Sequence, residues 1–244
     1  MKFDELQMYF GKDYSINQYL TIHQPTIGEI VEFGEERYYS MVYTLCAVPG
    51  DMKATLWDKG IDYETLTDYQ LFCHLAPCLT QEDTSLLLGE IDLSIMELGF
   101  NYEANQPTLV DFNSGLIIDE AVYWHMVEYI RKLHSVTPNR ETYMNAYTKR
   151  YMIDEERRKS ELNKNKPYKS FLLPLISSMV NSPGFKYKKN ELKEVGIMEF
   201  MDSVSRISLM TNAHALLQGC YSGMIDATKI NKDGLNWMKS LGEN

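Results

Sequence analysis

One corner near the start of the chain constrains the fold more than any other stretch: residues 20–35, which read LTIHQPTIGEIVEFGE. Apolar and polar residues alternate over the first four positions, which is the pattern of a short strand. Pro25 ends it, because proline has no N–H for a ladder and restricts the residue before it. Thr26 and Glu29 form a capping-box pattern, in which each side chain accepts a hydrogen bond from the other residue's backbone N–H. The sequence therefore predicts a strand, a sharp stop and a capped helix, with Pro25, Thr26 and Glu29 as structural residues.

Composition narrows the class of protein. The chain has 244 residues, 44% of them hydrophobic, so it is able to build a core. Its formal net charge of −10 disfavours general nucleic-acid binding, which needs surplus cations against phosphate. No apolar run reaches the roughly 18–20 residues of a membrane span, and the acidic start does not read as a signal peptide. We therefore expect a cytoplasmic protein without a membrane partner, and its four cysteines are expected to be reduced thiols.

The first half of the chain shows helical periodicity. One helix breaks near Gly34, and the next buries a face whose members are spaced i, i+3, i+4 and i+7: Tyr38, Met41, Val42 and Leu45. The turn at residues 49–51 leads into a short helix over 52–57, and Gly60 is the glycine expected to close it. Thr65 with Asp68 is the predicted start of a further helix that runs to Pro77.

Residues 96–118 are the predicted sheet. Apolar and other residues alternate over 96–100, and the runs 108–112 and 116–118 flank Asn113-Ser114-Gly115, a three-residue connection. Together with the early strand they predict a small antiparallel sheet of about three strands. We expect an α+β protein that is predominantly helical.

The rest of the chain is predicted to be helical. Asp119 precedes an amphipathic helix, and Thr137-Pro138 has the form of an N-cap and first residue of another. Apolar patterns over 171–180 and 197–217 predict two more helices, Gly223 marks a turn, and Trp237 is expected in a short final helix. The predicted organisation is a mixed α/β domain over 1–148, a charged helical arm and linker over 149–170, and a helical domain over 171–244.

Residues 149–169 are the candidate binding stretch, because they carry eight cations against four carboxylates. The residues chosen as candidates for partner binding are Lys149, Arg150, Arg157, Arg158 and Lys159. A nucleic-acid-binding adaptor would use such a stretch, but cations mixed with carboxylates at helical spacing are typical of a solvated face.

The remaining chemical motifs favour structural interpretations. Cys73, His74 and Cys78 offer three zinc ligands, but the second pair that a structural zinc site needs is missing. His125 and Glu128 share a helix face without a metalloprotease HExxH pattern. The carboxylate pairs Glu90/Asp92 and Asp111/Asp119 are ordinary in an acidic chain. We predict no catalytic residue, no metal and no cofactor, with a metal-dependent enzyme of unknown reaction left as an alternative.

Two blocks of the sequence resemble a known family. The first reads TIHQPTIGEI over 21–30, with EFGE at 32–35, PGDM at 49–52 and GIDY at 60–63. The second reads FMDSVSRI over 200–207, with GCYSGMID at 219–226 and the pairs 229–230 and 236–237. Together they are similar to uncharacterised proteins encoded in the tail-morphogenesis region of phages and prophages of Gram-positive bacteria.

This resemblance implies a non-enzymatic protein of virion assembly or structure. It would be a tail or baseplate component, or a tail assembly chaperone that holds the tape-measure protein. Its partners would be other phage proteins, with further copies of itself as another candidate. It would act in the host cytoplasm during assembly, whether or not it then enters the particle. The family has no established catalytic residues to carry over.

Overall fold

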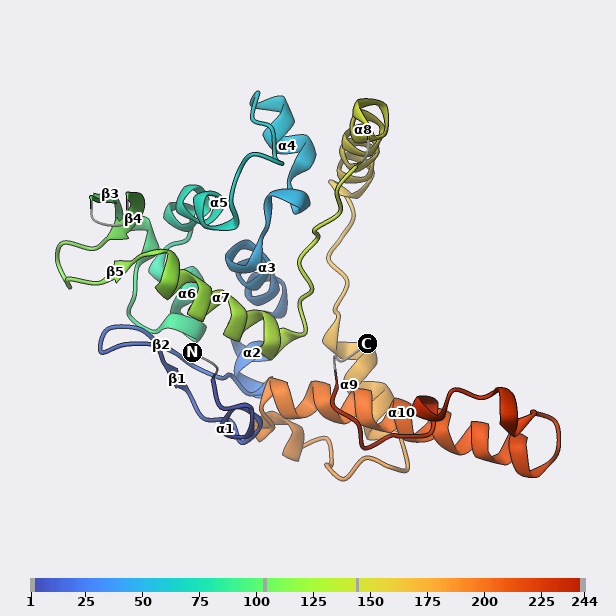
Figure 1. The fold of residues 1–244 in the computed structure, drawn as a ribbon. Coiled ribbons are helices and arrows are strands. Elements are labelled where there is room, and N and C mark those ends of the chain that lie inside the picture. The colour runs from blue at the N-terminus through green and yellow to red at the C-terminus, as the bar shows by residue number, and fades with distance from the viewer. Residues whose placement is uncertain (1–2, 103–104, 144, 242–244) are drawn as a thin grey trace.

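The computed structural model describes residues 3–102, 105–143 and 145–241, and helices predominate (Figure 1). Up to the sheet, the elements are α1 (Glu5–Tyr9), β1 (Tyr14–Ser15), β2 (Thr21–Ile22), α2 (Ile27–Phe33), α3 (Glu35–Cys46), the 3-10 helix η1 (Pro49–Asp51), α4 (Lys53–Asp58), α5 (Asp68–Leu75), η2 (Ala76–Cys78), α6 (Gln81–Leu88) and η3 (Leu93–Ile95). They continue with β3 (Glu97–Asn101), β4 (Gln106–Val110), β5 (Ile117–Ile118), α7 (Glu120–His134), α8 (Ala146–Asn163), α9 (Leu172–Val180), η4 (Glu191–Glu194), α10 (Ile197–Tyr221), η5 (Ala227–Lys229) and η6 (Lys232–Gly234).

The predicted fold class is confirmed: a mostly helical α+β chain with a small antiparallel sheet of three strands in the order β3-β4-β5. One detail of the prediction is wrong. The early strand β2 does not join this sheet but pairs with β1 in a separate two-stranded ladder. A tight loop between Ser15 and Thr21 supplies β2 with its partner locally, since Ile16 and Asn17 both donate backbone N–H groups to the Leu20 carbonyl.

One large apolar cluster holds most of the elements together. Helix α7 lies at its centre, where five of its side chains are fully withdrawn from solvent: Tyr123, Met126, Val127, Ile130 and Leu133. The predicted face of α3 packs on it, because Tyr38, Met41, Val42 and Leu45 are all buried. The same cluster includes Leu172 from α9 and Phe200 from α10. The part before residue 149 and the part after residue 170 therefore share a core, and the predicted domain boundaries stay a prediction.

The predicted corner is present as a capping box. The Thr26 hydroxyl accepts from the Glu29 N–H at 3.2 Å, and Glu29 Oε2 accepts from the Thr26 N–H at 2.7 Å. Helix α2 ends at Gly34, whose φ of 100° is a conformation that residues with a Cβ avoid. Gly60 likewise has a positive φ of 75° just after α4, the helix it is expected to close, and Gly223, expected in a turn, has a φ of 73° just after α10.

Three predicted helix positions are wrong. Helix α5 is capped by Thr67 with Gln70, whereas the Thr65 hydroxyl donates to the Asp62 carbonyl. Thr137-Pro138 begins no helix; the next one starts at Ala146, capped by Asn145. Trp237 lies in a turn, where its carbonyl accepts a hydrogen bond from Arg206.

Two elements project from the body. Helix α8 lies at the top right of Figure 1, joined to the body by two extended connections and packed beside α4. Helix α10 extends to the right along the bottom, and the chain after it returns along its side. Within the described residues, none of the helices is both long and apolar enough to cross a bilayer.

Candidate protein interaction surfaces

The corner at Pro25 also contacts a segment far along the chain, just before α10. The Ile27 N–H donates to the Val195 carbonyl, and the Ile197 N–H donates to the Pro25 carbonyl, both at 2.9 Å. The two segments run antiparallel there, with a bridge between Thr26 and Gly196. We call residues 25–28 and 193–197 the joint. Sequence reasoning missed it, because the two segments are about 170 positions apart and neither has the length of a strand.

Beside the joint, His23 lies between two carboxylates. Its Nδ1 is 2.9 Å from Asp13 Oδ1, and its Nε2 is 3.5 Å from Glu29. Burial alone would raise the pKa of Glu29, but the hydrogen bonds from Thr26 and the nearby His23 lower it overall. His23, Thr26 and Glu29 therefore have a structural role, because their hydrogen bonds stabilise the start of α2.

Most of the candidate cations of α8 are already paired inside the molecule. Lys149 Nζ donates to Asp62 at 2.6 Å and to Glu64 at 2.7 Å, and it lies over the Tyr63 ring. The hydrogen bond from Lys149 lowers the pKa of Asp62. Arg157 reaches Asp58 on α4, so both residues fasten α8 to the α4 region.

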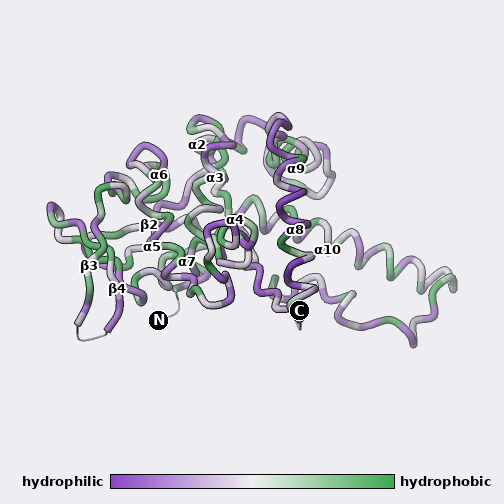
Figure 2. Tube along the Cα trace, turned by 90° about the horizontal axis from the view of Figure 1, so that it is seen from above, coloured by the Kyte–Doolittle hydropathy of each residue, from purple (hydrophilic) through white to green (hydrophobic). Residues whose placement is uncertain are grey.

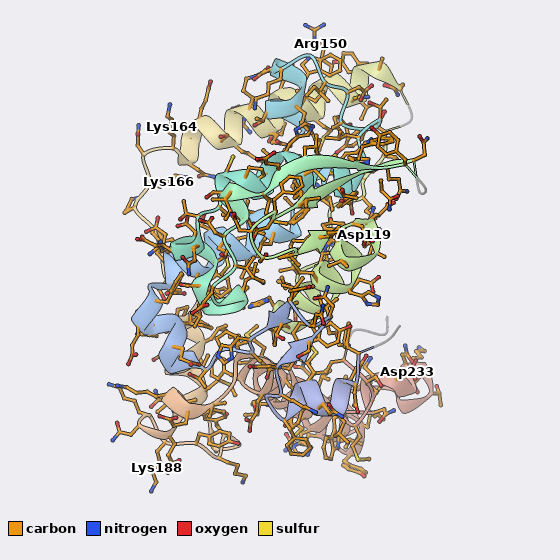
Figure 3. The ribbon with its side chains drawn as sticks, turned by 90° about the vertical axis from the view of Figure 1, so that its left-hand side faces the viewer. Asp119, Arg150, Lys164, Lys166, Lys188 and Asp233 are labelled. Atoms are coloured by element: carbon orange, nitrogen blue, oxygen red, sulfur yellow. The ribbon has the colours of Figure 1, made fainter. Side chains whose placement is uncertain are left out.

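The other three candidate cations, unlike Lys149 and Arg157, make no ion pair to the α4 region in the described residues. Arg158 pairs with Glu155 one turn earlier, and Lys159 Nζ is 3.8 Å from the same carboxylate. Arg150 points away from the body at the top of Figure 3, and the described residues provide it with no ion pair. The cationic surface that remains for a partner is therefore much smaller than the sequence indicates.

One residue of α8 is buried beneath the helix. Ile153 is 1% exposed and packs in a second cluster with Ala54, Leu56, Tyr63 and Leu71. This cluster fixes α8 on α4, apart from the main core. On the outer face of α8, Tyr147 and Tyr151 are 83% and 59% exposed.

A buried ionic group ties the connection before α8 to the body. Asp68 accepts from Arg140 at 2.8 Å and lies 3.5 Å from Arg131, which itself donates to the Cys46 carbonyl. Nearby, the buried Lys53 donates to the Tyr143 hydroxyl at 2.9 Å. These contacts attach residues 139–143 to the body in a segment that is not helical.

The residues considered for chemistry are not brought together. Cys73 is buried, where burial raises its pKa, while His74 and Cys78 are exposed. His125 contacts the Tyr14 hydroxyl, Asp111 binds its own turn at Ser114, and Asp119 caps α7. Among the described residues, no cluster of three or more His, Cys, Asp or Glu side chains is arranged to hold a metal ion.

Large apolar side chains are exposed at several outlying places. They include Phe10 just after α1, Leu98 and Phe100 on β3, Tyr147 on α8, Tyr221 and Met224 at the end of α10, and Met238 in the segment that returns beside α10. Figure 2 shows the β3–β4 hairpin and the far end of α10 at opposite margins of the molecule. Exposed aromatic and methionine side chains are characteristic of surfaces that contact other proteins.

Comparison of the chain with protein-family models, with curated proteins and with solved structures yields no significant match.

Proposed function

We propose that this chain is a non-enzymatic assembly or structural protein of a tailed phage, acting through contacts with other polypeptides. The observation that carries the proposal is the exposure of Tyr147 on α8 and of Tyr221 and Met224 at the end of α10 and in the turn that follows it, each 83% or more. Aromatic and methionine side chains are enriched in surfaces that contact other proteins. The phage context comes from the resemblance of residues 21–63 and 200–237 to tail-region proteins.

The proposal leaves two roles. A tail or baseplate component would remain in the particle, and an assembly chaperone would bind the tape-measure protein and leave. Mass spectrometry of purified particles distinguishes them: a component is found at a fixed copy number, whereas a chaperone is found only in lysates with incomplete tails.

The test is co-expression with each tail and tape-measure protein of the same phage, followed by affinity capture through this chain. We expect capture of at least one tail protein and at least tenfold weaker capture by the variant Tyr221→Ser/Met224→Ser. Thr211→Ser, which changes another exposed residue of α10, is the matched control and should capture normally. Failure to capture any of these proteins, with normal tails made in the absence of this chain, would contradict the proposal.

A further inference from the structure

Strand β3 forms an open edge of the sheet. In the order β3-β4-β5 it pairs with β4 alone, and none of the other described strands lies beside it. Figures 1 and 2 show it at the outer margin of the molecule. Leu98 and Phe100 on this strand are 64% and 47% exposed. An exposed edge with apolar side chains is a template for pairing with another strand.

The ladder shows which backbone groups of β3 face outward. The Asp111 N–H donates to the Leu116 carbonyl. Because backbone groups alternate in direction along a strand, Asp111, Leu109 and Pro107 direct theirs to the β5 side. Pro107 fits this assignment, since it has no N–H to donate to β3. The remaining residues of β4 bond to β3, which leaves the N–H and C=O groups of Leu98 and Phe100 directed to the open edge.

Strand β3 lacks most of the usual protections of a sheet edge. Natural edges are blunted by charged residues, above all lysine, and by proline, bulges or very short strands. Strand β3 has five residues, ELGFN, with one charge at its first position, Glu97, without lysine or proline, and its register with β4 is continuous. The opposite edge, β5, has two residues.

The sequence of β3 is complementary to itself in one register. When two copies of the strand run antiparallel with Gly99 opposite Gly99, Leu98 of each lies opposite Phe100 of the other. The only charged residue of the strand, Glu97, then lies opposite Asn101 and not opposite another carboxylate. The groups directed to the edge also match, because each Leu98–Phe100 pair is able to exchange two backbone hydrogen bonds.

The apolar face of the combined sheet is consistent with this register. Leu98 shares its face with its partner Leu109 and with Ile118, which are 1% and 0% exposed against the body. A two-fold axis perpendicular to the sheet keeps the same face of both copies on one side. Leu98 and Phe100 of the two copies would then form one apolar layer that continues the buried face.

We propose that two copies of this chain associate edge to edge through β3, with Gly99 at the two-fold axis, to form a continuous six-stranded sheet. Five paired residues on each side bury a small area compared with the roughly 1,200 Å² at the lower end of stable protein interfaces. The dimer should therefore be weak, with a population that rises between about 10 µM and 1 mM protein. The pairing does not rest on the phage assignment, and a monomeric chain that still captures tail proteins would overturn only the pairing.

The test is sedimentation velocity across this concentration range with three double variants of the exposed pair. Leu98→Lys/Phe100→Lys and Leu98→Glu/Phe100→Glu place like charges opposite each other, so each alone should dimerise at least tenfold more weakly than the native chain. An equimolar mixture of the two should associate again. Leu98→Lys/Phe100→Glu places lysine opposite glutamate only in the proposed register, and this variant should dimerise by itself.

Val31→Lys/Tyr43→Lys is the matched control, since it adds the same two charges at exposed apolar residues of α2 and α3, which are 60% and 59% exposed. It should leave association unchanged, and the thermal unfolding of all variants should match that of the native chain because the altered side chains are exposed. A native chain that stays monomeric at 1 mM overturns the proposal, even when its β3 binds an extended segment of another protein. So does a dimer that Leu98→Lys/Phe100→Lys leaves intact, or one that Leu98→Lys/Phe100→Glu abolishes.

Discussion

Thr26 combines side-chain and backbone contacts at one position. Its hydroxyl caps α2 through the Glu29 N–H, the same hydroxyl lies 2.9 Å from Glu29 Oε2, and its backbone bridges to Gly196. Only the first two depend on the side chain. Thr26 therefore combines a local capping contact, which the sequence predicts, with a long-range backbone contact, which the sequence does not predict.

Thr26→Ala should lower the free energy of unfolding by about 1 kcal/mol, because the Glu29 N–H loses its acceptor at the helix start. For a chain of this length the midpoint of thermal unfolding should fall by about 2–4 °C. Calorimetry measures this shift. Thr26→Ser retains the hydroxyl and should stay close to the native value; an equal loss in both variants would refute the capping role.

His134 is a second residue with a defined chemical state. Its Nδ1 lies 2.8 Å from the Ile130 carbonyl, which only accepts, so Nδ1 carries the proton and Nε2 accepts from the Tyr38 hydroxyl. Burial lowers the pKa of His134 to about 4. The folded state therefore holds the ring neutral across the range in which a free histidine becomes charged.

Stability should consequently fall as the pH falls from about 6.5 towards 4, because the unfolded chain binds a proton there and the folded chain does not. The ring remains partly exposed, so the loss between pH 7.5 and 5 is at most about 2 kcal/mol. Urea unfolding at both pH values measures it. His134→Gln should remove this part of the pH dependence, and an unchanged slope in that variant would refute the assignment.

Helix α8 is an element whose position depends on few contacts. It has one buried residue, Ile153, in its 18 residues, together with ion pairs from Lys149 and Arg157 to the α4 region. Partly exposed ion pairs contribute about 0–1 kcal/mol each, so the apolar contact of Ile153 stabilises the arm more than either ion pair does. The arm should accordingly open more easily than the body.

Ile153→Ala should release α8 without unfolding the rest, because a buried isoleucine is worth about 2–5 kcal/mol and its cluster is separate from the main core. Hydrogen exchange of residues 146–163 should become at least tenfold faster, with little change in α7. Tyr151→Ala, on the exposed face, provides the comparison and should exchange as the native chain does. Equal acceleration in α7 would show that the arm and the body unfold together.

The same pairing of charges leads to a prediction about nucleic acid. Because four of the five candidate cations are engaged with carboxylates, we expect no mobility shift of DNA or RNA even at about 50 mM salt. Arg157→Gln/Arg158→Gln should instead loosen α8, visible as faster proteolysis. A shift at low salt that this variant abolishes would restore the nucleic-acid alternative.

At the scale of the whole molecule, the joint connects the beginning of the chain to α10. Gly28 lies in α2, where alanine would ordinarily favour the helix by about 1 kcal/mol. A Cβ there would come within 2.7 Å of the Lys193 carbonyl oxygen, which is backbone and unable to move alone. The close approach of the two segments therefore requires glycine.

Gly28→Ala should destabilise the protein by about 1–3 kcal/mol, since the overpacked contact outweighs the gain in helix propensity. Chemical denaturation measures the difference. Gly184→Ala is a suitable control, because a Cβ there would lie 3.7 Å from Ile207, an ordinary contact. A neutral or stabilising Gly28→Ala would show that the two segments of the joint are not held at this point.

Local signals make part of this fold predictable from the sequence. The capping box at Thr26, the apolar face of α3 and the glycines after α4 and α10 are confirmed, because each depends on neighbours within one or two turns. The cap of α5 lies two residues beyond the predicted one, because Thr65 and Thr67 both precede a suitable partner and hydrogen bonding to Asp62 occupies the first. Choosing between two such cap positions requires knowledge of tertiary contacts and neighbouring turns, which the capping pattern alone does not give.

Sequence by itself determined the helical class of this protein, the small antiparallel sheet and the corner at Pro25, since periodicity and capping act over a few residues. Tertiary structure alone decided that this corner meets residues 195–197, that Lys149 and Arg157 pair with carboxylates in and after α4, and that β3 is left as an open edge. These are contacts between residues far apart in the chain. Their energies depend on which surfaces the packing brings together, and a charge or a strand has no fixed partner until then.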